Sequence, residues 1–249
     1  MNGIGRIGRV LFGVAMAVLG LLYLFHARGQ GLVPGPPWTA ETGTRAWLIG
    51  AGFVVAGVCI AAGVWARLAA VLLGIALLLR ALLIFVPEIF AHVHDPGPWT
   101  SGFEVLALSA ASFVMAGEAE NASSITWDGL VFIGRILFAA ALVVFGVQHF
   151  IYAKFVATLV TPWIPNHLFW AYFVGVAFIV AALSIAMKIQ ASLAAGLLGL
   201  MFLLWVAVLH VPRVMAALHN GNEWTSCLIA LAMGGGSLVL SGALRRCND

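Results

Sequence analysis

The sequence contains very little charge for its length. Only 8% of its 249 residues are Asp, Glu, Lys or Arg, whereas soluble domains carry about 25%. This scarcity excludes an ordinary soluble domain, a disordered chain and a charged coiled coil. The 12 Lys and Arg residues are scattered without a basic cluster, so nucleic acid is not an expected partner.

Cysteine and catalytic patterns are scarce as well. The three cysteines, at positions 59, 227 and 247, form neither a C-x-x-C pair nor a metal-ligand spacing. A disulfide scaffold and a dithiol relay within this chain are therefore not expected. No Ser-His-Asp or paired-carboxylate arrangement is present, so the sequence predicts no catalytic residue.

Hydrophobic residues make up 63% of the chain, and the mean hydropathy is +1.09. A helix needs about 20 apolar residues, at a rise of 1.5 Å each, to cross a bilayer core of about 30 Å. Apolar runs of about this length lie near residues 10–26, 46–65, 68–86, 101–117, 130–151, 169–187, 190–211 and 225–242. They predict an all-α, polytopic membrane protein with eight transmembrane helices and the lipid bilayer as its surroundings.

The second half of the chain repeats short motifs of the first at an offset of 125 or 126 residues. The matches are Ile7-Gly8-Arg9 with Ile133-Gly134-Arg135, Pro37-Trp38 with Pro162-Trp163, Val86-Pro87 with Val211-Pro212, and Trp99-Thr100 with Trp224-Thr225. They predict two four-helix repeats, residues 1–125 and 126–249. Four is even, so both repeats enter the membrane in the same direction, related by an axis along the membrane normal. The first apolar run is then a retained span, since its opening recurs at mid-chain.

The distribution of charge and of histidine predicts an orientation. Seven Lys or Arg residues fall on the side of the termini and four on the other side, with Arg80 inside a span, which places both termini in the cytoplasm. All nine prolines and all seven histidines then lie in or beside the outer loops. They indicate a structured outer cap that docks other subunits; the alternative is an aromatic belt with prolines that end the helices.

Two charged residues fall inside predicted spans of the first repeat. Arg80 lies about 9 Å and Glu104 about 7 Å inside the outer ends of their helices, given the helical rise. A charge at membrane depth is costly, so it is normally paired and often functional. Their similar depth makes them natural partners. A structural ion pair or snorkelling to the interface is the alternative.

The second repeat carries a different polar set. It has Trp205 and Ile229 where the first has Arg80 and Glu104, but it gains His149, His210 and the neighbouring Gln148. A pocket between the repeats would present both sets to an amphipathic ligand with its polar head near the outer leaflet, a quinone or a lipid. The predicted ligand-binding residues are Arg80, Glu104, Gln148, His149 and His210.

Simpler roles for the histidines stay open. Each helical histidine could hydrogen-bond to a neighbouring helix or to interfacial water. A metal at His92-x-His94-Asp95 and a haem between His149 and His210 are weaker hypotheses. The sequence therefore predicts no metal ligands and no cofactor beyond the candidate quinone.

Several of these motifs resemble a known family. Gly8-Arg9, the stretch from Gly57 to Gly63 and Arg67-Leu68-Ala69-Ala70 resemble the DoxX and DoxD-like four-helix membrane proteins. Further motifs similar to a DoxX-like subgroup are Gly134-Arg135, Gln148-His149-Phe150, Pro162-Trp163-Ile164-Pro165 and Glu223-Trp224-Thr225. The resemblance implies a bacterial inner-membrane protein. Some members are subunits of thiosulfate:quinone oxidoreductase, and others are associated with thiol and oxidative-stress systems.

The chain also departs from that family. Val54 and Ile179 stand where the family often has a glutamate, and Ser192 replaces the arginine in the second repeat. No enzymatic role is therefore carried over. The expected function is an accessory subunit of a respiratory or redox membrane complex, with a quinone or lipid pocket. A small-molecule transporter built on parallel repeats and a purely structural scaffold are the alternatives.

Overall fold

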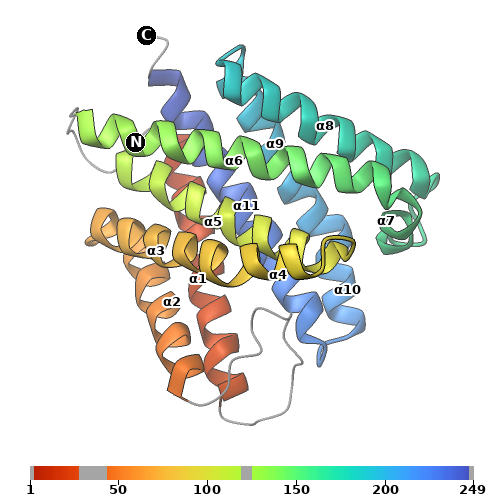
Figure 1. Ribbon diagram of the computed structural model, residues 1–249, viewed down its shortest axis with the longest axis horizontal. Helices are drawn as coiled ribbons and strands as arrows, with labels where there is room; N and C mark the ends of the chain where they lie inside the picture. Colours follow the sequence, from red (N-terminus) through yellow and green to blue (C-terminus); the bar gives the residue numbers. More distant parts are fainter. Residues whose placement is uncertain (1–2, 28–43, 119–124, 247–249) are drawn as a thin grey trace.

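The computed structural model describes residues 3–27, 44–118 and 125–246, and all of its regular elements are helices (Figure 1). The helices are α1 (Gly3–Ala27), α2 (Thr44–Ala62), α3 (Ala66–Arg80), α4 (Val86–Ala91), α5 (Pro96–Glu118), α6 (Ile125–Ile151), α7 (Ala153–Leu159), α8 (His167–Met187), α9 (Ala191–Trp205), α10 (Val211–Ala216) and α11 (Gly221–Arg246). Pro37-Trp38, Arg28 and Cys247, which belong to the motifs and counts given above, lie outside the described residues.

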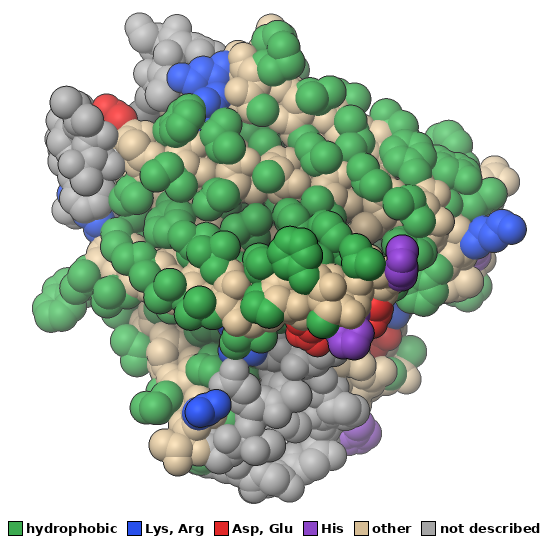
Figure 2. Space-filling model, viewed as in Figure 1, with side chains coloured by type: hydrophobic (Ala, Val, Ile, Leu, Met, Phe, Trp, Pro, Cys, Tyr) green, Lys and Arg blue, Asp and Glu red, His purple; other side chains and the backbone are tan. Residues whose placement is uncertain are grey.

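Eight helical segments are long and apolar enough to cross a membrane. They are α1, α2, α3 continued through α4, α5, α6, α8, α9 continued through α10, and α11. The predicted all-α fold with eight spans is confirmed for the described residues. Large side chains such as Leu83 and Phe90 are 71% and 80% exposed, and Figure 2 shows hydrophobic side chains over most of the visible face. A soluble monomer rarely exposes such an apolar surface, which fits a chain surrounded by lipid.

Two spans are longer than the apolar runs predicted. Those runs end near Val86 and Val211, but the helices continue to Ala91 and Ala216 through π segments at Ala81–Phe85 and Val206–His210. The N–H of the residue before each proline donates to a carbonyl five residues back. The wider turn accommodates a proline ring that would clash with the carbonyl four residues earlier in an α-helix. These prolines therefore do not end their helices.

The fourth spans of the two halves, α5 and α11, form the centre of the bundle. They contact each other, and most of their residues are buried. α1 packs against α2 and α11, and α6 packs against α8 and α5. Each half therefore places its first span against the fourth span of the other half.

Glycines allow the first span of each half to pack closely against the fourth span of the other half. A Cβ atom at Gly8 would lie 2.4 Å from the Gly235 carbonyl oxygen, and one at Gly134 would lie 2.6 Å from the Ala110 carbonyl oxygen. Real Cβ atoms do not approach backbone oxygens this closely. Small residues let membrane helices approach to backbone contact, so the glycine of each Gly-Arg motif is needed for packing.

The bounds of the helices recur along the chain. α3 covers 66–80 and α9 covers 191–205, and both π segments, α4 with α10, and the starts of α5 and α11 also differ by 125 residues. The duplication at residue 125 and the symmetry of the two halves in a membrane stay predictions.

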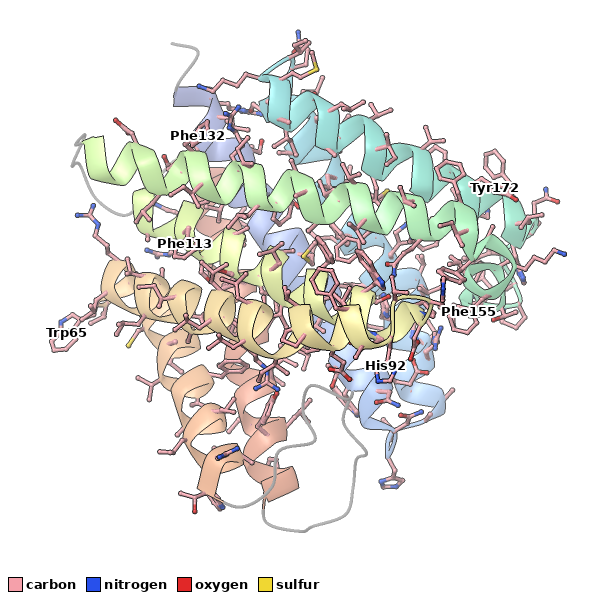
Figure 3. The ribbon with its side chains drawn as sticks, in the orientation of Figure 1. Trp65, His92, Phe113, Phe132, Phe155 and Tyr172 are labelled. Atoms are coloured by element: carbon pink, nitrogen blue, oxygen red, sulfur yellow. The ribbon has the colours of Figure 1, made fainter. Side chains whose placement is uncertain are left out.

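Both described ends of the chain lie at the same end of the bundle, since Gly8 on α1 contacts Gly235 on α11 (Figure 1). We call this the terminal end, and the opposite one the distal end. The distal end holds the starts of α5, α8 and α11 and the end of α6. Figure 3 shows Phe155 and Tyr172 at the distal end, and Trp65 and Phe132 toward the terminal end.

Candidate ligand-binding cavity at the distal end

A cavity of about 500 Å³ lies at the distal end of the bundle. It is lined by residues of α5, α6, α7, α8, the end of α9 with its π segment, and α11. Its walls are mainly apolar and aromatic. The side chains with polar groups that line it are Thr100, Glu104, Gln148, His149, Tyr152, Trp170, Trp205, His210 and Ser226.

Four of the five residues predicted to bind a ligand line this cavity. Glu104 comes from the first half of the chain, and Gln148, His149 and His210 come from the second half. They meet because α6 packs on α5 rather than on the fourth span of its own half. Arg80 is not among the lining residues, whereas its counterpart Trp205 is.

The expected pairing of Arg80 with Glu104 is not seen. Within the described ranges, no hydrogen bond or ion pair involves Glu104. The continuation of the third span to Ala91 places Arg80 about 16 Å from its end, while Glu104 lies about 12 Å from Pro96, at 1.5 Å per residue. Both residues lie farther from their helix ends than expected, because α4 continues the third span to Ala91 and α5 begins at Pro96, before the predicted run.

His149 is held in one orientation on α6. Its Nδ1 lies 2.8 Å from the Phe145 carbonyl oxygen, and a carbonyl can only accept, so Nδ1 carries the proton in this hydrogen bond. In the neutral ring, Nε2 is then an acceptor. The ring also meets Phe178 edge-on, with centroids 5.2 Å apart. Tyr23 and Phe53 form the same kind of contact in the first half, at 5.7 Å.

His210 ends the π segment of the seventh span and lines the cavity. Its Nδ1 is buried and has no hydrogen-bond partner among the described residues. The counterpart in the first half, Phe85, is a buried apolar side chain. Buried polar atoms are normally hydrogen-bonded, so this nitrogen is an exception inside the bundle, while the His210 side chain lines the cavity.

Gln148 braces two helices. Its Nε2 donates to Thr100 Oγ1 at 3.0 Å and to the Pro96 carbonyl oxygen at 3.4 Å. The Thr100 hydroxyl in turn donates to the Pro96 carbonyl oxygen at 2.9 Å. The amide hydrogens of Gln148 are thus used between α6 and α5, and its role at the cavity is to position these helices.

Two features at or beside the cavity were not predicted from the sequence. The helix α7, with Phe155, Val156 and Leu159 in the cavity wall, lies in a segment interpreted as an outer loop. Arg213 forms a two-pronged ion pair with Glu223, with Nε to Oε2 at 2.8 Å and Nη2 to Oε1 at 2.7 Å. Its Nη1 donates to the Leu159 carbonyl oxygen at 3.1 Å.

Together these contacts fasten α7 to α10 and α11. The apolar residues of α7 are a signal in the sequence for this packed helix. The position of the Arg213 pair has no sequence signal, because its residues come from different elements.

Tryptophans fasten the distal loops. The indole N–H groups of Trp99 and Trp224 donate to the Val93 and Leu218 carbonyl oxygens, each at 3.0 Å. These pairs occupy equivalent positions of the two halves. Trp99 and Trp224 therefore hold the distal loops together, a role additional to the interfacial location that the sequence predicts for them.

The His92-x-His94 motif has no third metal-binding side chain beside it among the described residues. In residues 3–27, 44–118 and 125–246, no three His, Cys, Asp or Glu side chains gather as a metal site. His92 and His94 are exposed, and of the predicted constellations it is the cavity set that the structure brings together.

The chain was compared with protein-family models, curated proteins and solved structures, and none of them matches. The resemblance to DoxX and DoxD-like proteins therefore stays a prediction from short motifs. Evidence for function comes from the cavity itself.

Proposed function

We propose that the protein binds an amphipathic membrane ligand whose polar head occupies the distal cavity, and that a quinone or quinol is the leading class. The observation that carries this proposal is the convergence of Glu104, His149 and His210 from both halves of the chain on one cavity. The volume of about 500 Å³ falls in the range typical of small-molecule sites.

The chemistry of the lining supports a ring with hydroxyl or carbonyl groups. Glu104 and His149 Nε2 are acceptors for hydroxyl groups, and the His210 side chain lines the same cavity. Aromatic walls from Phe145, Phe178 and other residues suit a flat ring. A bound quinone would supply reversible two-electron chemistry, whereas these side chains bind and orient the head.

We further propose that the chain is a DoxX-like accessory subunit of a bacterial inner-membrane redox complex, with both termini cytoplasmic and other subunits docking on the distal loops. The recurring helix bounds support a duplicated four-helix unit. The Gly-Arg motif gains a structural role, because Arg135 donates to the Ile185 and Ala186 carbonyl oxygens at the end of α8.

The test is the ligand content of the full chain in lipid nanodiscs, with extracted small molecules quantified by mass spectrometry. The variants are His149→Phe, His210→Phe and Glu104→Gln. Matched controls are His92→Phe, at an exposed position, and Glu88→Gln, at a half-buried one; neither residue lines the cavity. We expect about tenfold lower quinone content in the cavity variants, or about 1.4 kcal/mol, and wild-type content in the controls.

Equal content in all variants would contradict the cavity as the site. No ligand in the wild type together with stable co-purified subunits would favour the scaffold. Substrate uptake by reconstituted liposomes would favour the transporter. Each alternative function thus has its own readout.

A further inference from the structure

A second hollow lies between α8 and α9 on the outside of the bundle. It has a volume of about 800 Å³ and a nearly all-apolar lining that includes Phe173 and Ala177 from α8 and Leu193 and Leu197 from α9. It extends along α9 from Gln190 to Trp205, about 22 Å at 1.5 Å per residue. This groove therefore follows most of the thickness of a bilayer core of about 30 Å.

The groove adjoins the distal cavity at two tryptophans. Trp170 and Trp205 line both spaces. Their rings meet edge to face, with centroids 5.7 Å apart and planes at 83°. The Trp170 indole N–H donates to the Pro165 carbonyl oxygen at 3.1 Å, so Trp170 is anchored. No hydrogen bond to Trp205 is found in the part of the chain that the structure describes.

We propose that the α8/α9 groove binds the long hydrocarbon chain of the ligand whose head lies in the distal cavity, with the chain passing alongside the Trp170 and Trp205 pair that lines both spaces. This inference rests on the proposed function, and it specifies the ligand class as a lipid with a hydrogen-bonding head and a single long chain. Such a ligand reaches the site sideways from the bilayer.

Three observations select this occupant. The groove has almost no polar atoms, so it does not retain water. Leu193, Leu197 and Leu204 along it are more than half exposed, which places it against the hydrocarbon of the bilayer. Its distal end meets the one described cavity that carries Glu104, His149 and His210. A ligand with a polar head and an apolar chain matches a cavity with polar side chains that adjoins an apolar groove.

Comparison of the two halves supports placing the chain-binding groove in the second half. The positions equivalent to Trp170 and Trp205 in the first half are Arg45 and Arg80. The aromatic pair between groove and cavity therefore occurs in the same half as His149 and His210.

The first experiment compares two probes on the full chain in nanodiscs. One is a dimethoxy-methyl-benzoquinol without a side chain, and the other is the same head with a decyl chain; affinities are expressed per probe dissolved in the membrane. We expect the decyl probe to bind about tenfold more tightly, or about 1.4 kcal/mol. Ala177→Trp and Ala194→Trp, which fill the groove, should remove this advantage and leave the affinity of the chainless probe unchanged.

Val176→Trp is the matched control, since Val176 is half-exposed next to Ala177 but does not line the groove. Equal affinity of both probes for the wild type would overturn the chain site and leave the proposed function standing. Loss of the decyl advantage in Val176→Trp as well would also overturn it. Failure of both probes to bind would overturn the proposed function and this inference together.

A second measurement maps the chain directly. A decyl probe with a photoreactive group at the chain terminus should label peptides from 191–205 in the wild type and not in Ala177→Trp. Labelling of α7 or α11 in place of α9 would overturn the groove assignment. Because the wild type alone identifies the labelled peptide, the assignment of the chain to α9 does not depend on how stably the variant folds.

Discussion

His210 occupies the position at which the first half of the chain has Phe85. Replacing it should therefore change both the stability of the protein and its ligand binding. Its Nδ1 is buried without a partner among the described residues, and such an atom costs about 1–3 kcal/mol. We expect His210→Phe to unfold at a higher temperature than the ligand-free wild type, while losing ligand. Thermal unfolding in nanodiscs measures this, and lower stability of the variant would show that His210 is structural.

The Arg213 and Glu223 pair is the second feature at the residue scale. Both side chains are mostly buried and form two hydrogen bonds to each other, a geometry stronger than that of an exposed ion pair. We expect Arg213→Ala and Glu223→Ala each to destabilise the protein. Their double-mutant cycle should give a coupling of about 1–3 kcal/mol. A coupling near zero, measured by thermal unfolding, would contradict this role.

At the scale of elements, the π segments and the prolines that follow them decide where the third and seventh spans present their side chains. Pro212 follows the segment that carries His210. We expect Pro212→Ala to allow regular α-helical bonding, rotate His210 and lower ligand content about tenfold. Pro87→Ala is the matched change in the half that lacks His149 and His210, and it should leave ligand content unchanged.

Hydrogen exchange of residues 206–210, together with ligand content by mass spectrometry, tests this prediction. Equal ligand loss in Pro87→Ala and Pro212→Ala would show a general effect on folding. Unchanged ligand content in Pro212→Ala would show that the π segment does not position His210.

At the scale of the whole molecule, the exchanged contacts between halves depend on glycine. A Cβ at Gly134 would lie 2.6 Å from a backbone oxygen of α5, whereas one at Gly129 of the same helix would meet nothing within 4 Å. We expect Gly134→Leu to abolish the yield of monodisperse protein and Gly129→Leu to leave it near wild type. Size-exclusion chromatography in detergent measures the yield, and equal behaviour of the two variants would contradict the packing.

Properties that depend on short stretches could be predicted from the sequence alone. The transfer of about 20 apolar residues into a bilayer is a local property, so the existence of eight spans followed directly. The choice of Glu104, His149 and His210 came from comparing the halves, because side chains retained or gained at equivalent positions are visible without coordinates. The extensions through Pro87 and Pro212 were not predicted, because a proline in a sequence normally indicates a helix end.

Tertiary structure decided which faces meet. Close approach of glycines places α6 on α5 and α1 on α11, and this exchange brings Glu104 next to residues of the other half. The same packing leaves Arg80 out of the cavity and lets Gln148 brace two helices. Hydropathy is nearly uniform around most of these spans, so it does not specify their rotation or partners; steric fit between distant small residues does. The sequence by itself therefore determined that the chain crosses the membrane and where its halves diverged, and only packing decided which diverged residues share a cavity.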